Sequence, residues 1–487
     1  MKKKPHVMLN LIQHLISLIS NETLKQSMKQ VQDMVQGDRF KTFIRVSIVF
    51  PFLLVFIPYN ISAQEFSLEE LYSLALKNSE TIKISEEDLY ISERDKDRAM
   101  AVLFPTLSTF GSHTRYKEEK SGTTFTTQPE YSTSWGLRLD QSLSLSGREL
   151  TALKMAKETI VKSSFDLDNV KEGYLLNVAS AYYNLLKSKK AAEIAGANVD
   201  RLTKHRDAAQ TQLKVGEVTK TVLLRAEAEL LGAQSEMIRA ENNMKFTKTV
   251  LARTVGIEGE YDVRENQGTG GKERELKELD VIIVNCQLST VNCLKQTALT
   301  ERTELKTIEL ERKIAEDEIK YTRGLYWPTL SVEGVYSRRE DHPSSSFAIK
   351  ENIYGTLKLN FPFFEGGLRV AEVSQSRARL RQAEYRLSDL KKSVNVEVEN
   401  AYLNLITESG ILDKLQAEVD YARDNYNAVS KQFEYGLANS VDVMDANTLL
   451  VTAERELANA KYDYQLSILK LKRVTGILLK TVTAQFK

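Results

Sequence analysis

The chain has 487 residues and is nearly neutral, with 67 lysine and arginine residues against 66 aspartate and glutamate residues. Residues 1–63 hold eight basic and three acidic residues, so the remainder carries 59 basic and 63 acidic residues. A nucleic-acid binder should show a basic patch or stripe, and this balance gives no support to one. The two cysteines and the three histidines beyond residue 63 are too few to favour a zinc site, which needs about four ligands.

A short apolar segment near the N-terminus predicts export. Lys41 and Arg45 precede an apolar run from Val46 to Ile57, and Ala63 supplies a small residue for a cleavage site. A helix needs about 20 residues to span a bilayer, so this run is too short. We therefore predict that residues 1–63 are an N-terminal extension and signal peptide. A short buried core helix is the alternative. No later run of apolar residues predicts a transmembrane helix.

The rest of the chain contains an internal duplication. Residues 103–108 (LFPTLS) recur at 326–331 (YWPTLS), and residues 181–185 (AYYNL) recur at 401–405 (AYLNL). Such internal repetition more often builds a symmetric scaffold than a catalytic pocket. We predict a first repeat over 64–257, an insert over 258–293 and a second repeat over 294–487. Each repeat should contain a helix, a β-hairpin and a long helical hairpin.

Four strands are expected, two in each repeat. Apolar and polar residues alternate from Trp135 to Leu145 and again from Ile353 to Phe363, which indicates strands with one apolar face. Pro105 and Pro328 each open a further strand. Polar loops separate the two strands of each hairpin. A soluble sheet edge would show the same alternation, so the pattern alone does not establish contact with lipid.

The proline-free stretches 130–327 and 363–487 predict long helices. From Leu412 to Phe433, apolar residues follow steps of three and four, and the pattern resumes beyond Gly436. This spacing indicates supercoiled, closely packed helices. A continuous helix from residue 147 to residue 213 would be about 100 Å long at about 1.5 Å per residue. Gly216 and Gly436 should turn each long helix back into an antiparallel partner.

The order of these motifs, with 361–367 (FPFFEGG) and 433–446 (FEYGLANSVDVMDA), resembles the TolC family of outer membrane efflux proteins. The resemblance covers nearly all of residues 64–487. It implies a mainly α fold with a β-barrel segment, in which a homotrimer pools four strands per chain into a 12-stranded barrel. It also implies a location in the outer membrane lipid, with the helices forming a periplasmic tunnel.

The same resemblance implies a passive duct that completes a tripartite export system. An inner-membrane pump and a periplasmic adaptor would be its partners, and drugs, metals or proteins would be its cargo. The rival interpretation is an exported periplasmic coiled-coil protein without a pore. No nucleophile–base motif, phosphate loop or metal cluster predicts an enzyme, and we expect no cofactor.

Asp442 and Asp445 are the candidate entrance residues. Their i, i+3 spacing places them on one helix face, and three copies would gather six carboxylates, which favour cations. The resemblance implies that acids at these two positions line a closed periplasmic entrance. The alternative is structural, because Ser440 is typical of an N-cap and acids suit the first turn of a helix.

The two helical turns are the candidate adaptor contacts. The resemblance implies that Val215, Gly216 and Glu217 in the first repeat, with Gly436 and Leu437 in the second, touch the helices of the adaptor. A glycine turn between two helices needs no such partner, and both explanations can hold together.

Cys286 and Cys293 could form a disulfide bond if the segment between them is not helical. On a helix, their Cα atoms would stand about 10.5 Å apart, beyond the usual limit of about 7 Å. An oxidising periplasm favours the bond. His205 lies within a predicted helix without a Cys or His partner nearby, so we expect it at the surface rather than on a metal.

Overall fold

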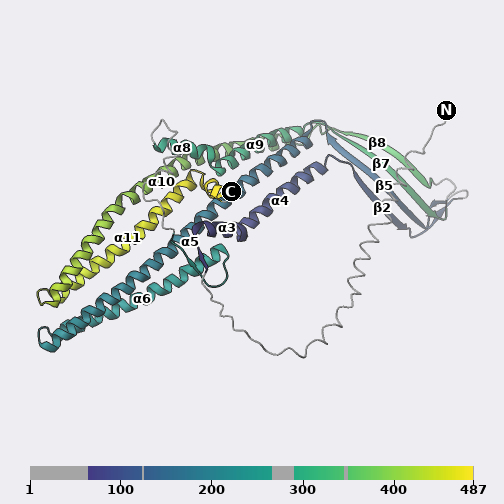
Figure 1. The fold of residues 1–487 in the computed structure, drawn as a ribbon. Coiled ribbons are helices and arrows are strands. Elements are labelled where there is room, and N and C mark those ends of the chain that lie inside the picture. The colour runs from purple at the N-terminus through teal and green to yellow at the C-terminus, as the bar shows by residue number, and fades with distance from the viewer. Residues whose placement is uncertain (1–63, 123–125, 266–289, 345–348, 486–487) are drawn as a thin grey trace, which may run out of the picture. The chain divides into compact units, whose positions relative to one another are not determined.

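The computed structural model describes residues 64–122, 126–265, 290–344 and 349–485 (Figure 1). The predicted signal peptide lies outside these ranges. None of the helices in the described part of the chain combines the length and the apolar character needed to cross a membrane.

Each repeat begins with a helix pair and continues into a long helical hairpin (Figure 1). Ser67 starts the first helix through a capping box with Glu70, and Ser79 accepts a hydrogen bond at the start of the second. The first-repeat helices are α3 (Leu68–Asn78), α4 (Glu80–Ala101), α5 (Arg148–Val215) and α6 (Lys220–Val255). The second-repeat helices are α8 (Thr290–Glu301), α9 (Thr303–Gly324), α10 (Leu368–Glu434), α11 (Ser440–Val474) and α12 (Leu478–Gln485).

The long helices are uninterrupted, as the absence of proline predicted. α5 runs for 68 residues and α10 for 67, which corresponds to about 100 Å each at about 1.5 Å per residue. Both begin directly after a glycine in a left-handed conformation, Gly147 (φ 69°) and Gly367 (φ 86°). The two helices thus start where the strands end, so each long hairpin leads away from the sheet.

The four predicted strands form one antiparallel sheet. They are β2 (Thr106–Arg115), β5 (Tyr131–Ser144), β7 (Thr329–His342) and β8 (Glu351–Asn360), in the order β2-β5-β7-β8. The hairpins β2–β5 and β7–β8 are those expected, and the pairing of β5 with β7 joins the two repeats. Short strands form two further pairs, β3 (Lys120–Ser121) with β4 (Thr126–Gln128), and β1 (Gln64–Phe66) with β6 (Tyr261–Val263).

The register divides the four-stranded sheet into an apolar and a polar face. Leu107 lies opposite Leu139, and Val332 lies opposite Leu357, so these side chains share one face. All four are exposed, Leu107 and Leu357 with 71% of their surface accessible. The other face carries charges, among them Arg138, whose Nε lies 3.2 Å from Glu333 Oε1. A single chain therefore leaves the apolar face of its sheet uncovered.

The apolar core lies where the helices of both repeats meet. Leu71 of α3, Leu175 and Tyr182 of α5 and Leu251 of α6 are almost completely buried there, together with Leu478 of α12. A second cluster packs α8 and α9 against α10 and α11. Burial at these crossings fixes the two long hairpins in one structural unit.

Candidate functional site

The turns at the ends of the two helical hairpins are exposed. α5 ends at Val215, and Gly216 (φ 82°) closes it by donating its backbone N–H to the last turn. Gly436 (φ 71°) reverses the chain between α10 and α11. Glu217 is exposed, as is Leu437, with 78% of its surface accessible. The structure places the predicted tip residues at the surface, and their contact with an adaptor stays a prediction.

Asn439, not Ser440, is the N-cap of α11. Its Oδ1 accepts hydrogen bonds from the backbone N–H groups of Val441 (2.8 Å) and Asp442 (3.0 Å). Asp442 Oδ2 accepts the backbone N–H of Asn439 in return, at 3.1 Å. Asp442 therefore completes a capping box, which is the structural role that the alternative interpretation anticipated.

Asp445 lies one turn further along α11 and has no such role. Its side chain is exposed and makes no hydrogen bond or ion pair with any described residue. Asp442 is exposed as well, so the two carboxylates share an accessible helix face, as their spacing predicted. A gating role for them stays a prediction.

Ser440 and His205 form a buried hydrogen bond with each other. The prediction that His205 lies at the surface is wrong, because only 5% of its surface is accessible. Its Nε2 is 2.9 Å from Ser440 Oγ, and its ring centroid is 4.7 Å from that of Phe433. Burial lowers the pKa of His205. The pair ties α5 of the first repeat to α11 of the second, close to the tips.

Further polar contacts join α5 of the first repeat to α10 and α11 of the second. Asn198 Oδ1 accepts from Asn447 Nδ2 at 2.8 Å, and Arg201 Nε donates to Asn447 Oδ1 at 3.0 Å. Nearer the tip, Gln212 Nε2 donates to the backbone oxygen of Phe433 at 2.7 Å. Sequence reasoning missed this row. The signal was present, because residues 198, 201, 205 and 212 directly precede positions 199, 202, 206 and 213, which follow the three-and-four spacing of the coiled-coil pattern in α5.

An apolar cluster joins the two tips beside this polar row. Ala209 of α5 and Ala226 of α6 pack with Phe433 of α10 and Val443 of α11, and all four are buried. Within one chain, the ends of the two hairpins are thus held together by both apolar and polar contacts.

Cys293 lies in α8, is buried and is disulfide-bonded. Its predicted partner, Cys286, lies outside the described residues, so that pairing stays a prediction. Within the described ranges, no three His, Cys, Asp or Glu side chains gather closely enough to hold a metal ion. The geometry presents two joined helical tips, exposed carboxylates and a sheet with one apolar face.

Comparison with known families agrees with this architecture. The family described as "Outer membrane efflux protein" matches residues 71–256 and again 294–477, one match in each repeat. The two matches together cover well over half of the chain. The chain therefore belongs to the outer membrane efflux protein family. The internal duplication read from the sequence is confirmed, while the exact domain boundaries stay a prediction.

Individual relatives share only low sequence identity with this chain. The chain is 24% identical over 316 residues to the outer membrane protein TolC of Escherichia coli (strain K12), covering 62% of this chain and 61% of that protein. It is 25% identical over 320 residues to the alkaline protease secretion protein AprF of Pseudomonas aeruginosa, with 64% of each chain covered. The chain thus spans about three fifths of the length of these relatives.

Solved structures share the fold. A crystal structure of CusC superposes with a TM-score of 0.73 at 18% identity, covering 85% of this chain and 93% of that one. The open state of the Neisseria gonorrhoeae MtrE outer membrane channel superposes with a TM-score of 0.67 at 18% identity, covering 85% of this chain and 89% of that one. At such low identity these likenesses establish the fold alone.

Proposed function

We propose that this chain forms a passive duct in the outer membrane. It completes a tripartite system that carries drugs, metals or proteins from an inner-membrane pump, through a periplasmic adaptor, to the outside. The observation that carries the proposal is the four-stranded sheet, which has an exposed apolar face and two open edges. Membership of the outer membrane efflux protein family supports it.

The sheet cannot satisfy its edges within one chain. An open edge exposes unpaired backbone groups, which lipid does not tolerate. The edge strands β2 and β8 run antiparallel to each other, because each of the three strand pairs between them is antiparallel. The β2 of a second copy can therefore pair with β8 and continue the alternation. Four strands from each of three copies would close a barrel of 12, above the minimum of about eight.

The helices leave matching surfaces for a second copy. On α6, Leu224, Leu231 and Ile238 are spaced by seven residues and are 51%, 63% and 60% exposed. On α10, Val396 and Leu403 keep the same spacing and are also exposed. Exposed apolar residues in heptad spacing indicate a helical partner. A second copy supplies one, so the helices of three chains would line a tunnel.

The carboxylates of Asp442 and Asp445 form the proposed entrance. Because Asp442 also caps α11, Asp445 is the cleaner residue for a test. Purified protein is inserted into planar bilayers, and single-channel conductance, cation preference and block by divalent cations are measured. Asp445→Asn should weaken the block and lower the cation preference, and Asp442→Asn with Asp445→Asn should weaken both further.

The outcomes of this experiment distinguish a duct from a periplasmic coiled-coil protein without a pore. Channels that are blocked equally in wild-type and variant protein would refute the entrance role while leaving the duct in place. A soluble, non-conducting periplasmic protein, without trimers in the outer membrane fraction, would refute the duct and favour the coiled-coil scaffold.

Contact with an adaptor is proposed for the exposed tips. Gly216 and Gly436 hold left-handed turns, so replacing them would strain the backbone. Val215→Asp with Leu437→Asp instead changes only exposed side chains. Co-purification with the adaptor should be lost in this variant and kept in Leu150→Asp, which changes an exposed leucine at the far end of α5. Equal retention in the two variants would refute the contact.

A further inference from the structure

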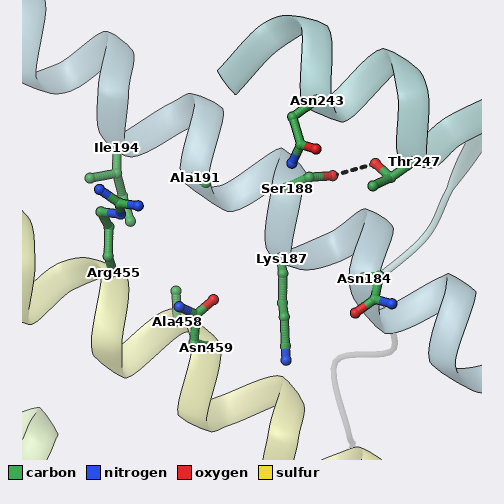
Figure 2. Close-up of a pocket in the computed structure, with 10 residues that line it drawn as sticks. All are labelled: Asn184, Lys187, Ser188, Ala191, Ile194, Asn243, Thr247, Arg455, Ala458 and Asn459. Atoms are coloured by element: carbon green, nitrogen blue, oxygen red, sulfur yellow. Dashed lines mark hydrogen bonds between the residues drawn. The ribbon is translucent and has the colours of Figure 1, made fainter. Parts of the chain in front are cut away.

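A polar pocket of about 300 Å³ lies where α5 and α6 of the first repeat meet α11 of the second (Figure 2). Three carboxamides line it, those of Asn184, Asn243 and Asn459, and none makes a side-chain hydrogen bond with a described residue. Two cations line it as well, Lys187 and Arg455. The three asparagines and Arg455 are exposed, so several polar groups that could bind a solute line one open hollow.

This pocket is lined by positive charges and by no negative charge. Its ten lining residues include no carboxylate, whereas Glu193 and Glu454 line one neighbouring cavity and Glu408 lines another. Lys187 reaches across to α11, where it forms an ion pair with Asp463. The guanidinium of Arg455 forms no ion pair within the described ranges. One positive charge is therefore left uncompensated, in a chain that is otherwise slightly acidic beyond residue 63.

The pocket has a fixed polar floor. Ser188 of α5 is buried, and its Oγ lies 2.6 Å from Thr247 Oγ1 of α6 (Figure 2). One of the two hydroxyls donates to the other, and the second donates to a backbone oxygen three residues earlier in its own helix, that of Leu185 or that of Met244. The Ser188–Thr247 bond joins α5 to α6, so it helps to fix the spacing between Asn184 on α5 and Asn243 on α6.

The pocket also lies in register with the proposed entrance. Asn459 follows Asp445 by two heptads along α11, so both residues occupy the same face of a supercoiled helix. Arg455 lies one turn before Asn459 and borders that face. If Asp445 faces the tunnel, the pocket opens from the same wall, deeper along the path of the cargo.

We propose that this pocket binds an oxyanion, a carboxylate or a phosphate, carried by the cargo. Arg455 would pair with the anion through its planar guanidinium. The N–H groups of the three asparagines would donate to its remaining oxygens. The role in transport rests on the proposed function, whereas the affinity for anions does not.

Titration of the purified full-length protein tests the binding itself. Inorganic phosphate and succinate are the probes, and calorimetry reads the dissociation constant. Saturable binding is expected, and Arg455→Gln should weaken it roughly tenfold or more, since a hydrogen bond to a charged group contributes at least that factor. Preference for one probe identifies the oxyanion. The matched control is Arg423→Gln, which removes a charge that already pairs with Glu454 in the neighbouring cavity.

A bilayer experiment tests the site within the duct. Succinate or phosphate added on the periplasmic side should reduce the wild-type current and affect the Arg455→Gln channel less. Absence of saturable binding, or an equal loss in the two arginine variants, would overturn the proposal. Retained binding by a protein that conducts no current would refute the duct and leave the anion site standing.

Discussion

Two equivalent glycines offer a sharp test of how the repeats differ. Gly256 and Gly476 lie 220 residues apart at the ends of α6 and α11, with φ values of 75° and 73°. A Cβ added at Gly476 would stand 2.8 Å from Arg302 N and 2.9 Å from Arg302 Cα. At Gly256, the nearest atom would be Asn78 Cβ, at 3.1 Å. The two sites share their backbone strain but not their surroundings.

Alanine at either site costs about 1–2 kcal/mol for the left-handed conformation. Overpacking should add a further 1–3 kcal/mol or so at Gly476, since the obstacle there is backbone. That backbone cannot shift freely, because the buried side chain of Arg302 is bound to Glu304 and Glu397. We therefore expect Gly476→Ala to lower the free energy of unfolding by about 2–5 kcal/mol.

Thermal and urea unfolding of the detergent-solubilised protein, followed by circular dichroism, measure this difference. Both variants are compared at one protein concentration, because assembly changes apparent stability by mass action. Gly256→Ala serves as the matched control for backbone strain. Equal losses of stability in the two variants, or a larger loss in Gly256→Ala, would refute the close packing of Gly476 against the start of α9.

Two further predictions concern α11 and the buried charges. Asn439→Ala should lower the free energy of unfolding by about 1 kcal/mol through loss of the cap, and thermal melts that show no loss of stability in this variant would contradict the cap. Burial raises the pKa of Glu304, but Arg473 and Arg302 outweigh burial and hold that pKa below its usual value. The stability from this carboxylate is present above the ordinary glutamate pKa and is lost as pH falls through the lowered one. Melts from neutral to acidic pH should therefore show a shallower acid slope in Glu304→Gln, and an unchanged slope would contradict this.

The elements could be predicted from the sequence because their signals are local. Alternation of apolar and polar residues identified the strands, and heptads without proline identified α5 and α10. The pairing of β5 with β7 was not predicted, because it joins residues 185 to 211 positions apart and leaves no periodic trace. The cap was misplaced by one residue, since Asn439 and Ser440 both suit an N-cap and periodicity does not resolve adjacent positions.

The burial of His205 could not be predicted from the sequence for a different reason. Absence of a Cys or His partner argues against a metal ligand, yet it says nothing of burial. The deciding partners, Ser440 and Phe433, come from the other repeat. Such contacts depend on which helix lies beside α5, and that choice is made by tertiary packing. Asp442 and Asp445 could be proposed from the sequence because their spacing is local, whereas the polar row on α5 was missed.

The duplication suits the proposed ring of three copies. One open sheet edge, β2, and one exposed heptad stripe, on α6, belong to the first repeat. The complementary edge, β8, and the stripe on α10 belong to the second. We propose that the rotation which brings β8 of one copy to β2 of the next also brings α10 to α6. Head-to-tail contacts of this kind form rings when the rotation closes and filaments when it does not. In the proposed assembly, one contact between strands and one between helices must be satisfied by the same rotation, and a rotation of one third of a turn is the one that closes three copies.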